Sequence, residues 1–134
     1  MCPLVEAYVA EAGVDRVDTL ARDMFRDPWP TGYDGMFFSN IFHDWDFEIC
    51  RDLAARAFEA LPADGRIFLH EALMNDGRDG PPTLAAFSIQ MLVSNRGQQF
   101  TFSDLEGILG EAGFVDVAAV STHAYYSVVS ARKP

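Results

Sequence analysis

Two strand-like runs separated by an amphipathic helix constrain the fold most strongly. Residues 33–39 contain the apolar run Met36 to Phe38, and residues 66–73 are apolar on both faces apart from His70 and Glu71. A strand that is apolar on both faces is typical of a parallel sheet covered by helices on each side. Asp46 can cap a helix that runs to about Leu61 and joins the two strands. The pattern predicts an α/β fold with a parallel sheet.

The rest of the chain continues this alternation and then closes with a hairpin. Glycine, proline and capping residues divide it into short elements. We expect helices over residues 3–12, 83–95 and 103–112, the last one capped by Ser103, and a strand over residues 16–21. Strands over residues 114–121 and 124–132 are joined by about two residues around His123, which requires antiparallel pairing.

Length and charge exclude several classes of protein. A chain of 134 residues with 49% hydrophobic residues can form one domain, or part of one. The net charge of -10 disfavours nucleic acids and anionic membranes as partners, because phosphate contacts need clustered Lys and Arg. Cys2 and Cys50 are too few for a disulfide framework, and Glu6 and Glu11 do not fit a signal peptide. With no apolar run long enough to span a bilayer, a cytoplasmic protein is expected.

His43 is the first candidate for chemistry, because it follows the strand at residues 33–39. In an open parallel sheet, side chains just past the carboxyl ends of strands face the ligand crevice. Glu71, near the end of the next strand, could hold the far ring nitrogen of His43 and support the imidazolium. The alternative is a histidine that caps the following helix and a glutamate in a surface salt bridge. Residue types alone favour this alternative.

For the neighbouring residues, a structural role is at least as well supported as a role in binding a ligand or a metal. Asp44 could contact ligand or serve the entry of the helix, and His70 is expected to be buried and neutral within its strand. Phe37, Phe38 and Trp45 are expected in the core. A metal site built from the two histidines with Asp44 and Glu71 is disfavoured, because adjacent strand residues point to opposite faces. Asp23 and Met24 could be a polar loop residue and a core residue.

Five motifs in one order carry a family resemblance. They are "RDMF" at residues 22–25, "SNIFHDW" at 39–45, "LPADGRIFLHEAL" at 61–73, "GQQF" at 97–100 and "EAGF" at 111–114. With them, nearly the whole chain resembles the S-adenosylmethionine-dependent O-methyltransferases of the acetylserotonin and caffeate type, including their bacterial relatives. The resemblance implies a Rossmann-like class I methyltransferase sheet, mostly parallel, with a C-terminal antiparallel hairpin. It also turns the catalytic interpretation of His43 into the favoured one.

The resemblance implies a role for each matching residue. His43 would be the general base and Glu71 the acidic residue that steadies it, with no metal involved. Methyl transfer would go from S-adenosylmethionine to a hydroxyl of a small, probably aromatic metabolite. The residues implied in binding are Asp23, Met24, Phe25 and Ser39 for the cofactor, and Asn40, Asp44, Phe87 and Met91 for the acceptor.

Two departures from the family pattern qualify this prediction. Gln99 stands where many plant members carry a second glutamate beside the histidine. The sequence has no G-x-G turn and no acidic residue after a second strand, so we expect the carboxyl-terminal part of a catalytic domain that lacks the first two strands. The strand at residues 33–39 would then expose an edge that invites pairing. A homo-oligomer or a complementary chain is expected, and a non-catalytic fragment or partner-completing subunit is the alternative.

Overall fold

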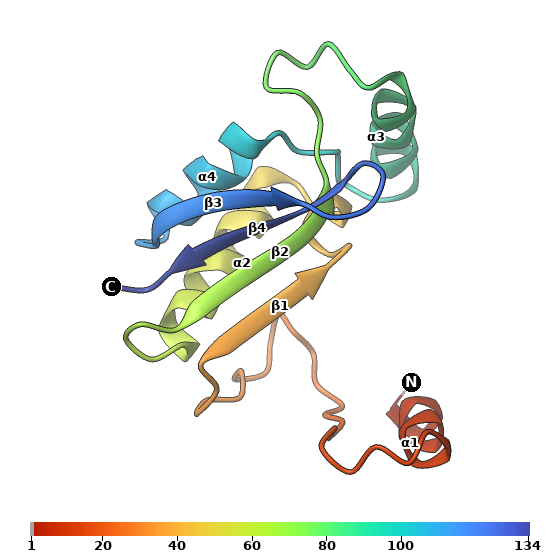
Figure 1. Ribbon diagram of the computed structural model, residues 1–134, viewed down its shortest axis with the longest axis vertical. Helices are drawn as coiled ribbons and strands as arrows, with labels where there is room; N and C mark the ends of the chain where they lie inside the picture. Colours follow the sequence, from red (N-terminus) through yellow and green to blue (C-terminus); the bar gives the residue numbers. More distant parts are fainter. Residues whose placement is uncertain (1) are drawn as a thin grey trace.

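The computed structural model describes residues 2–134, which form one sheet with helices packed on one of its faces, while the helix at residues 2–11 lies apart from the sheet (Figure 1). The four strands lie in the order β1-β2-β4-β3. In chain order the elements are α1 (Cys2–Glu11), β1 (Gly35–Ser39), the 3-10 helix η1 (Phe42–Asp44), α2 (Phe47–Ala60), β2 (Arg66–Ala72), α3 (Pro82–Ser94), α4 (Phe102–Glu111), β3 (Val115–Ser121) and β4 (Tyr126–Arg132).

The sheet contains one parallel pairing and two antiparallel pairings. β1 and β2 are parallel and joined through α2, with Ser39 opposite His70. β2 pairs with β4, and β3 with β4, in antiparallel fashion. The predicted α/β class, the helix between two parallel strands and the terminal hairpin are therefore confirmed. β1 lies at an edge of the sheet, as predicted for this strand.

The main core lies between one face of the sheet and the helices α2 and α4, which cover that face together (Figure 1). Along β2, Ile67, Leu69 and Glu71 point into this layer and are buried. α2 meets them with its apolar face, formed by Cys50, Leu53, Ala54 and Ala57. Asp46 begins α2 as predicted, since its side chain accepts a hydrogen bond from Ile49 N at 3.1 Å.

The opposite face of the sheet is much less covered. Phe37 on β1 and Val120 on β3 are 64% and 66% exposed. His70 is half-buried on this face, so the prediction of full burial is wrong for His70 and wrong for Phe37. Both side chains lie on the face of the sheet that α2 and α4 do not cover. By contrast, Phe38 and Trp45 pack against the core as predicted.

The predicted strand over residues 16–21 is absent, and this is the largest correction to the secondary structure. Residues 14–34 contain no helix or strand, and Val17 and Leu20 are 47% and 55% exposed. A strand needs a neighbour to accept and donate its ladder hydrogen bonds. The structure offers none to this segment.

Two smaller corrections concern element ends. Thr101, not Ser103, caps α4, because Thr101 and Asp104 form a reciprocal capping box. The connection between β3 and β4 covers residues 122–125 and is longer than predicted, with Ala124 at a φ of 52°. Among residues 2–134, no helix is both long and apolar enough to cross a membrane.

Candidate active site

His43 and Glu71 meet beyond the carboxyl ends of β1 and β2. His43 lies in η1, three residues after Asn40, and Glu71 is near the end of β2. The distance between His43 Nδ1 and Glu71 Oε2 is 3.0 Å. The other carboxylate oxygen, Oε1, accepts hydrogen bonds from Ile41 N at 3.1 Å and Phe42 N at 3.0 Å. The two side chains are buried, so water does not compete with these contacts.

The Nδ1 and Oε2 atoms lie within hydrogen-bond distance of each other, and the two side chains form an ion pair when the imidazole is protonated. Neither atom has another hydrogen-bond partner among residues 2–134. Burial by itself lowers the pKa of His43, but the Glu71 and Asp44 carboxylates outweigh it and raise the pKa above 6.5. The site therefore stabilises the protonated imidazole, which is the form a general base reaches after it takes a proton.

Asp44 connects His43 to the end of α3. Its Oδ1 lies 3.7 Å from His43 Nε2 and accepts a hydrogen bond from Asn95 Nδ2 at 2.8 Å. The residue after Asn95 also contacts the Asp44 backbone, because Arg96 N donates a hydrogen bond to Asp44 O at 3.4 Å. Asp44 thus does more than begin a helix, and Asp46, not Asp44, is the residue that caps α2.

Gly97 is packed directly against the backbone of η1. A Cβ atom at this position would lie 1.8 Å from His43 O and 2.5 Å from Asp44 C, distances that no side chain can occupy. Glycine is therefore required for the close approach of this segment to His43. The "GQQF" motif at residues 97–100 is part of the family resemblance, but no local pattern signals this contact, because the residues in contact are far apart in the chain.

α3 covers the imidazole from the side that faces away from β2. The Phe87 ring meets the His43 ring edge to face at 5.5 Å, and Met91 on the same helix is buried. His43 is only 5% exposed. Neither His43 nor Glu71 lines any of the four hollows described for residues 2–134, which lie elsewhere on the protein. The structure brings the pair together, but as it stands α3 closes the way to the ring.

The predicted cofactor residues Asp23, Met24 and Phe25 lie in a loop that α2 holds from one side. Arg56 Nη1 and Nη2 donate to Phe25 O at 2.5 Å and Asp27 O at 2.6 Å. Trp29 Nε1 donates to Met24 O at 2.8 Å. Asp23 Oδ1 accepts from Phe25 N at 2.9 Å, which fixes the turn locally. The Phe25 ring itself packs edge to face on Trp45 at 4.9 Å, and Phe25 remains 36% exposed.

An apolar hollow of about 280 Å³ lies beside this loop. Met24 and Trp29 line one part of it, and Met36, Phe37 and Phe38 of β1 line another. Ser39 and Asn40 follow at the end of β1. The Ser39 hydroxyl lies 3.0 Å from His70 Nδ1, and Asn40 Oδ1 accepts from Tyr126 Oη at 3.0 Å. The Asn40 side chain therefore points to the hairpin between β3 and β4, and not toward His43.

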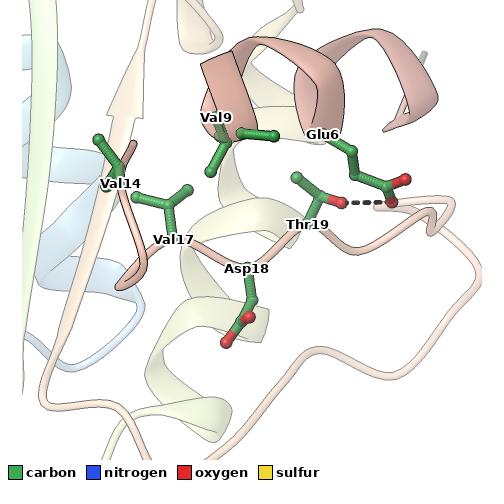
Figure 2. A pocket seen from close by; sticks show the side chains of 7 residues that line it. Glu6, Val9, Val14, Val17, Asp18 and Thr19 are labelled. Carbon is green, nitrogen blue, oxygen red and sulfur yellow. Dashed lines mark hydrogen bonds between the residues drawn. The ribbon is translucent and has the colours of Figure 1, made fainter. Parts of the chain in front are cut away.

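A separate hollow of about 400 Å³ lies between α1 and the segment that follows it (Figure 2). Figure 2 shows Val9, Val14 and Val17 around it, with Thr19 Oγ1 donating to Glu6 Oε1 at 2.8 Å. It shares no lining residue with the site described above. Its walls are mostly exposed side chains, so it is an open depression and not a formed site.

Two buried polar side chains near the site have contrasting roles. Cys50 Sγ donates to Phe42 O at 3.3 Å, and burial together with Glu71 and Asp46 raises the pKa of its thiol to about 12. This thiol stays protonated and unreactive. Gln99 is fully buried, and neither its Oε1 nor its Nε2 has a partner. The structure thus leaves the Gln99 amide unpaired among residues 2–134.

An open, mixed α/β sheet of this kind is part of a class I methyltransferase fold. The comparisons agree with this class. Residues 5–115 match the family model of the O-methyltransferase domain, and the chain belongs to this family. The 3-hydroxy-5-methyl-1-naphthoate 3-O-methyltransferase of Streptomyces sahachiroi is 37% identical over 90% of this chain and 35% of its own length.

Solved structures give the same result. A family 2 O-methyltransferase from Planctomyces limnophilus in complex with apigenin superposes with a TM-score of 0.93 at 29% identity, over 98% of this chain and 39% of that one. Human N-acetylserotonin methyltransferase in complex with S-adenosylmethionine gives 0.85 at 30% identity, over 94% and 37%. The chain spans about a third of the length of the curated relatives it matches.

Proposed function

We propose that this chain takes part in methyl transfer from S-adenosylmethionine to a hydroxyl group of a small aromatic metabolite, with His43 as the general base. The observation that carries the proposal is the buried pair of His43 and Glu71 beyond the ends of two parallel strands. Family membership supports the reaction class, and the aromatic compounds in the names of relatives support the class of acceptor.

The geometry assigns different roles to the two ring nitrogens. Nδ1 faces Glu71, so Nε2 is the nitrogen that can take the hydroxyl proton. When bound, S-adenosylmethionine supplies a methyl group on a positively charged sulfur, which leaves as a neutral thioether. As the acceptor oxygen bonds to the methyl carbon, its proton passes to Nε2, and Glu71 then faces a full imidazolium. Most of the rate enhancement beyond this proton transfer would come from holding the acceptor oxygen in line with the methyl group.

The loop and hollow beside β1 have the chemistry that the cofactor needs. The 280 Å³ hollow has apolar walls that suit a purine ring. Asp23 is largely solvent-facing and has a carboxylate that can accept from an exocyclic amino group. Met24 is half-buried beside it and can pack on the ring. We therefore propose Asp23 and Met24 for the adenine end and the Ser39 hydroxyl for a position along the cofactor.

Access to Nε2 requires a movement of α3 or of its side chains. Phe87 lies on the imidazole and Met91 is buried on the same helix, so the acceptor would take the place that Phe87 occupies. The outward face of α3 is highly exposed at Ile89, Leu92 and Val93, which leaves the helix few contacts to oppose such a displacement.

Calorimetric titration with S-adenosylhomocysteine tests the proposal on the full chain, alongside a methyl-transfer assay with a panel of phenols. Binding by the wild type, with binding retained and transfer lost in His43→Gln, is the expected result. The matched control is His123→Gln in the turn between β3 and β4, which should change neither. Undiminished transfer by His43→Gln would remove His43 as the base.

A second candidate function is that of a subunit whose site is completed by another polypeptide. The exposed edge of β1 favours it, because the backbone groups on its outer side have no ladder partner among residues 2–134. Analytical ultracentrifugation separates the two candidates. A chain that binds S-adenosylhomocysteine as a monomer contradicts this second function, and binding that appears only in an oligomer or after a partner is added supports it.

A further inference from the structure

His70 reaches the residues that leave β1 from the side opposite to Glu71. The two residues are adjacent in β2, so their side chains point to opposite faces of the sheet. Glu71 binds the backbone N–H groups of Ile41 and Phe42 on the buried face. His70 acts on Ser39 and Asn40 on the other face. We call residues 39–42 the strand exit, since they connect β1 to His43.

Both ring nitrogens of His70 have hydroxyl partners. Nδ1 lies 3.0 Å from Ser39 Oγ, and Nε2 lies 3.5 Å from Thr122 Oγ1 at the start of the hairpin connection. The ring is also stacked between aromatic neighbours, with the Tyr126 ring at 4.9 Å and the Phe37 ring at 6.1 Å. These contacts come from β1, β4 and the β3–β4 connection, so they fix the orientation of the imidazole.

Asn40 is the conformational weak point of the strand exit. It has a φ of 54°, in the left-handed region, which residues other than glycine adopt only at an energetic cost, although asparagine tolerates it better than most. Two contacts hold it there. Asn40 N donates to His70 O at 3.1 Å, and Tyr126 Oη, on the ring stacked against His70, donates to Asn40 Oδ1 at 3.0 Å. The first of these contacts uses the backbone carbonyl of residue 70, so the His70 side chain supports this turn through the Ser39 hydroxyl and through the stacked Tyr126 ring.

We infer that His70 is a positioning residue, which holds the strand exit from the face opposite to Glu71 and thereby keeps His43 against the Glu71 carboxylate. Its importance for methyl transfer rests on the proposed function. The positioning itself is a property of the folded chain and can be tested without any ligand.

The chain has three histidines, so proton–nitrogen NMR spectra of the imidazole rings resolve His43, His70 and His123 individually. In His70→Leu, a looser contact between His43 and Glu71 should lower the titration midpoint of His43 by about 0.5 pH unit. Ser39→Ala removes the same hydrogen bond with almost no change in volume and should shift the midpoint in the same direction. His70→Asn keeps a polar group near the position of Nδ1 and should restore part of the wild-type value. His123→Leu is the matched control and should leave His43 unchanged.

An unchanged His43 midpoint in folded His70→Leu and in Ser39→Ala overturns the inference, and it would mean that His70 only packs between aromatic rings. If His70→Leu does not fold, Ser39→Ala alone decides. Binding of S-adenosylhomocysteine to the wild type is measured separately. Its absence would count against the proposed function, while the His43 titration would still decide the role of His70.

Discussion

The His43–Glu71 pair and the Asp23–Met24 loop belong to one proposed site, yet the fold holds them very differently. The pair is buried, and it is surrounded by β2, η1, α3 and the segment at Gly97. The loop lies within residues 14–34, which have no helix or strand, and it is attached mainly through Arg56 and Trp29. Chemistry that needs an oriented ion pair is thus built into the core, whereas the proposed cofactor contacts depend on a few surface hydrogen bonds.

Gly97→Ala and Glu71→Leu should have the two largest effects, and Gly97→Ala tests the packing of the buried half. A Cβ atom 1.8 Å from His43 O forces the backbone apart, which should cost about 3 kcal/mol or more of unfolding free energy. Urea unfolding measures it. Gly107→Ala is the control, because nothing lies within 4 Å of a Cβ there and helix α4 should gain about 0.5–1 kcal/mol. Equal stabilities for the two variants would show that the segment at Gly97 does not pack on η1.

Glu71→Leu is the next test of the buried half. It leaves the N–H groups of Ile41 and Phe42 and the His43 ring without a partner, so the loss should be about 3–5 kcal/mol. Glu111→Leu removes an exposed carboxylate that pairs with Arg51, and the loss there should be below about 1 kcal/mol. Denaturant unfolding compares the two. Similar losses of unfolding free energy in the two variants would contradict the view that Glu71, and not Glu111, supports the core.

Arg56→Ala probes the loosely attached half. Losing two hydrogen bonds to Phe25 O and Asp27 O frees the loop, so affinity for S-adenosylhomocysteine should fall about tenfold, equal to about 1.4 kcal/mol. Calorimetry measures the change, and the His43 titration should stay as in the wild type. Arg51→Ala on the same helix is the control, since Arg51 pairs with Glu111 away from the loop. An equal loss of affinity in the control would mean that the loop does not shape the cofactor site.

The smallest effect concerns pH. The pKa of His43 is raised above 6.5 in the folded state, so the folded state binds this proton more tightly than the unfolded chain. The resulting stability is fully present below about pH 6.5 and is lost as the pH rises through the raised folded pKa. His43→Gln should therefore cost more unfolding free energy at about pH 5.5 than at about pH 8.5. A difference of opposite sign would mean that burial dominates over the carboxylates.

The sequence was sufficient for the parts of the molecule that depend on local patterns. Asp46 at the start of α2 and the two-sided apolar run of β2 were visible from residue types. The places of His43 and Glu71 at the ends of neighbouring strands left their pairing as one of two alternatives, and only the family resemblance favoured it. The strand expected over residues 16–21 failed because a strand depends on a neighbour that its own residues do not reveal. The close approach of Gly97, the Arg56 contacts and the cover that Phe87 forms join residues far apart in sequence, so no local pattern predicted them.

The NMR titration of His43 in the wild type and in Glu71→Gln tests the central claim most directly. We predict a His43 midpoint above 6.5 in the wild type, and a clear fall when the neutral amide replaces the carboxylate. A wild-type midpoint at or below 6.5 that is the same in Glu71→Gln would show that the two side chains do not form a working pair.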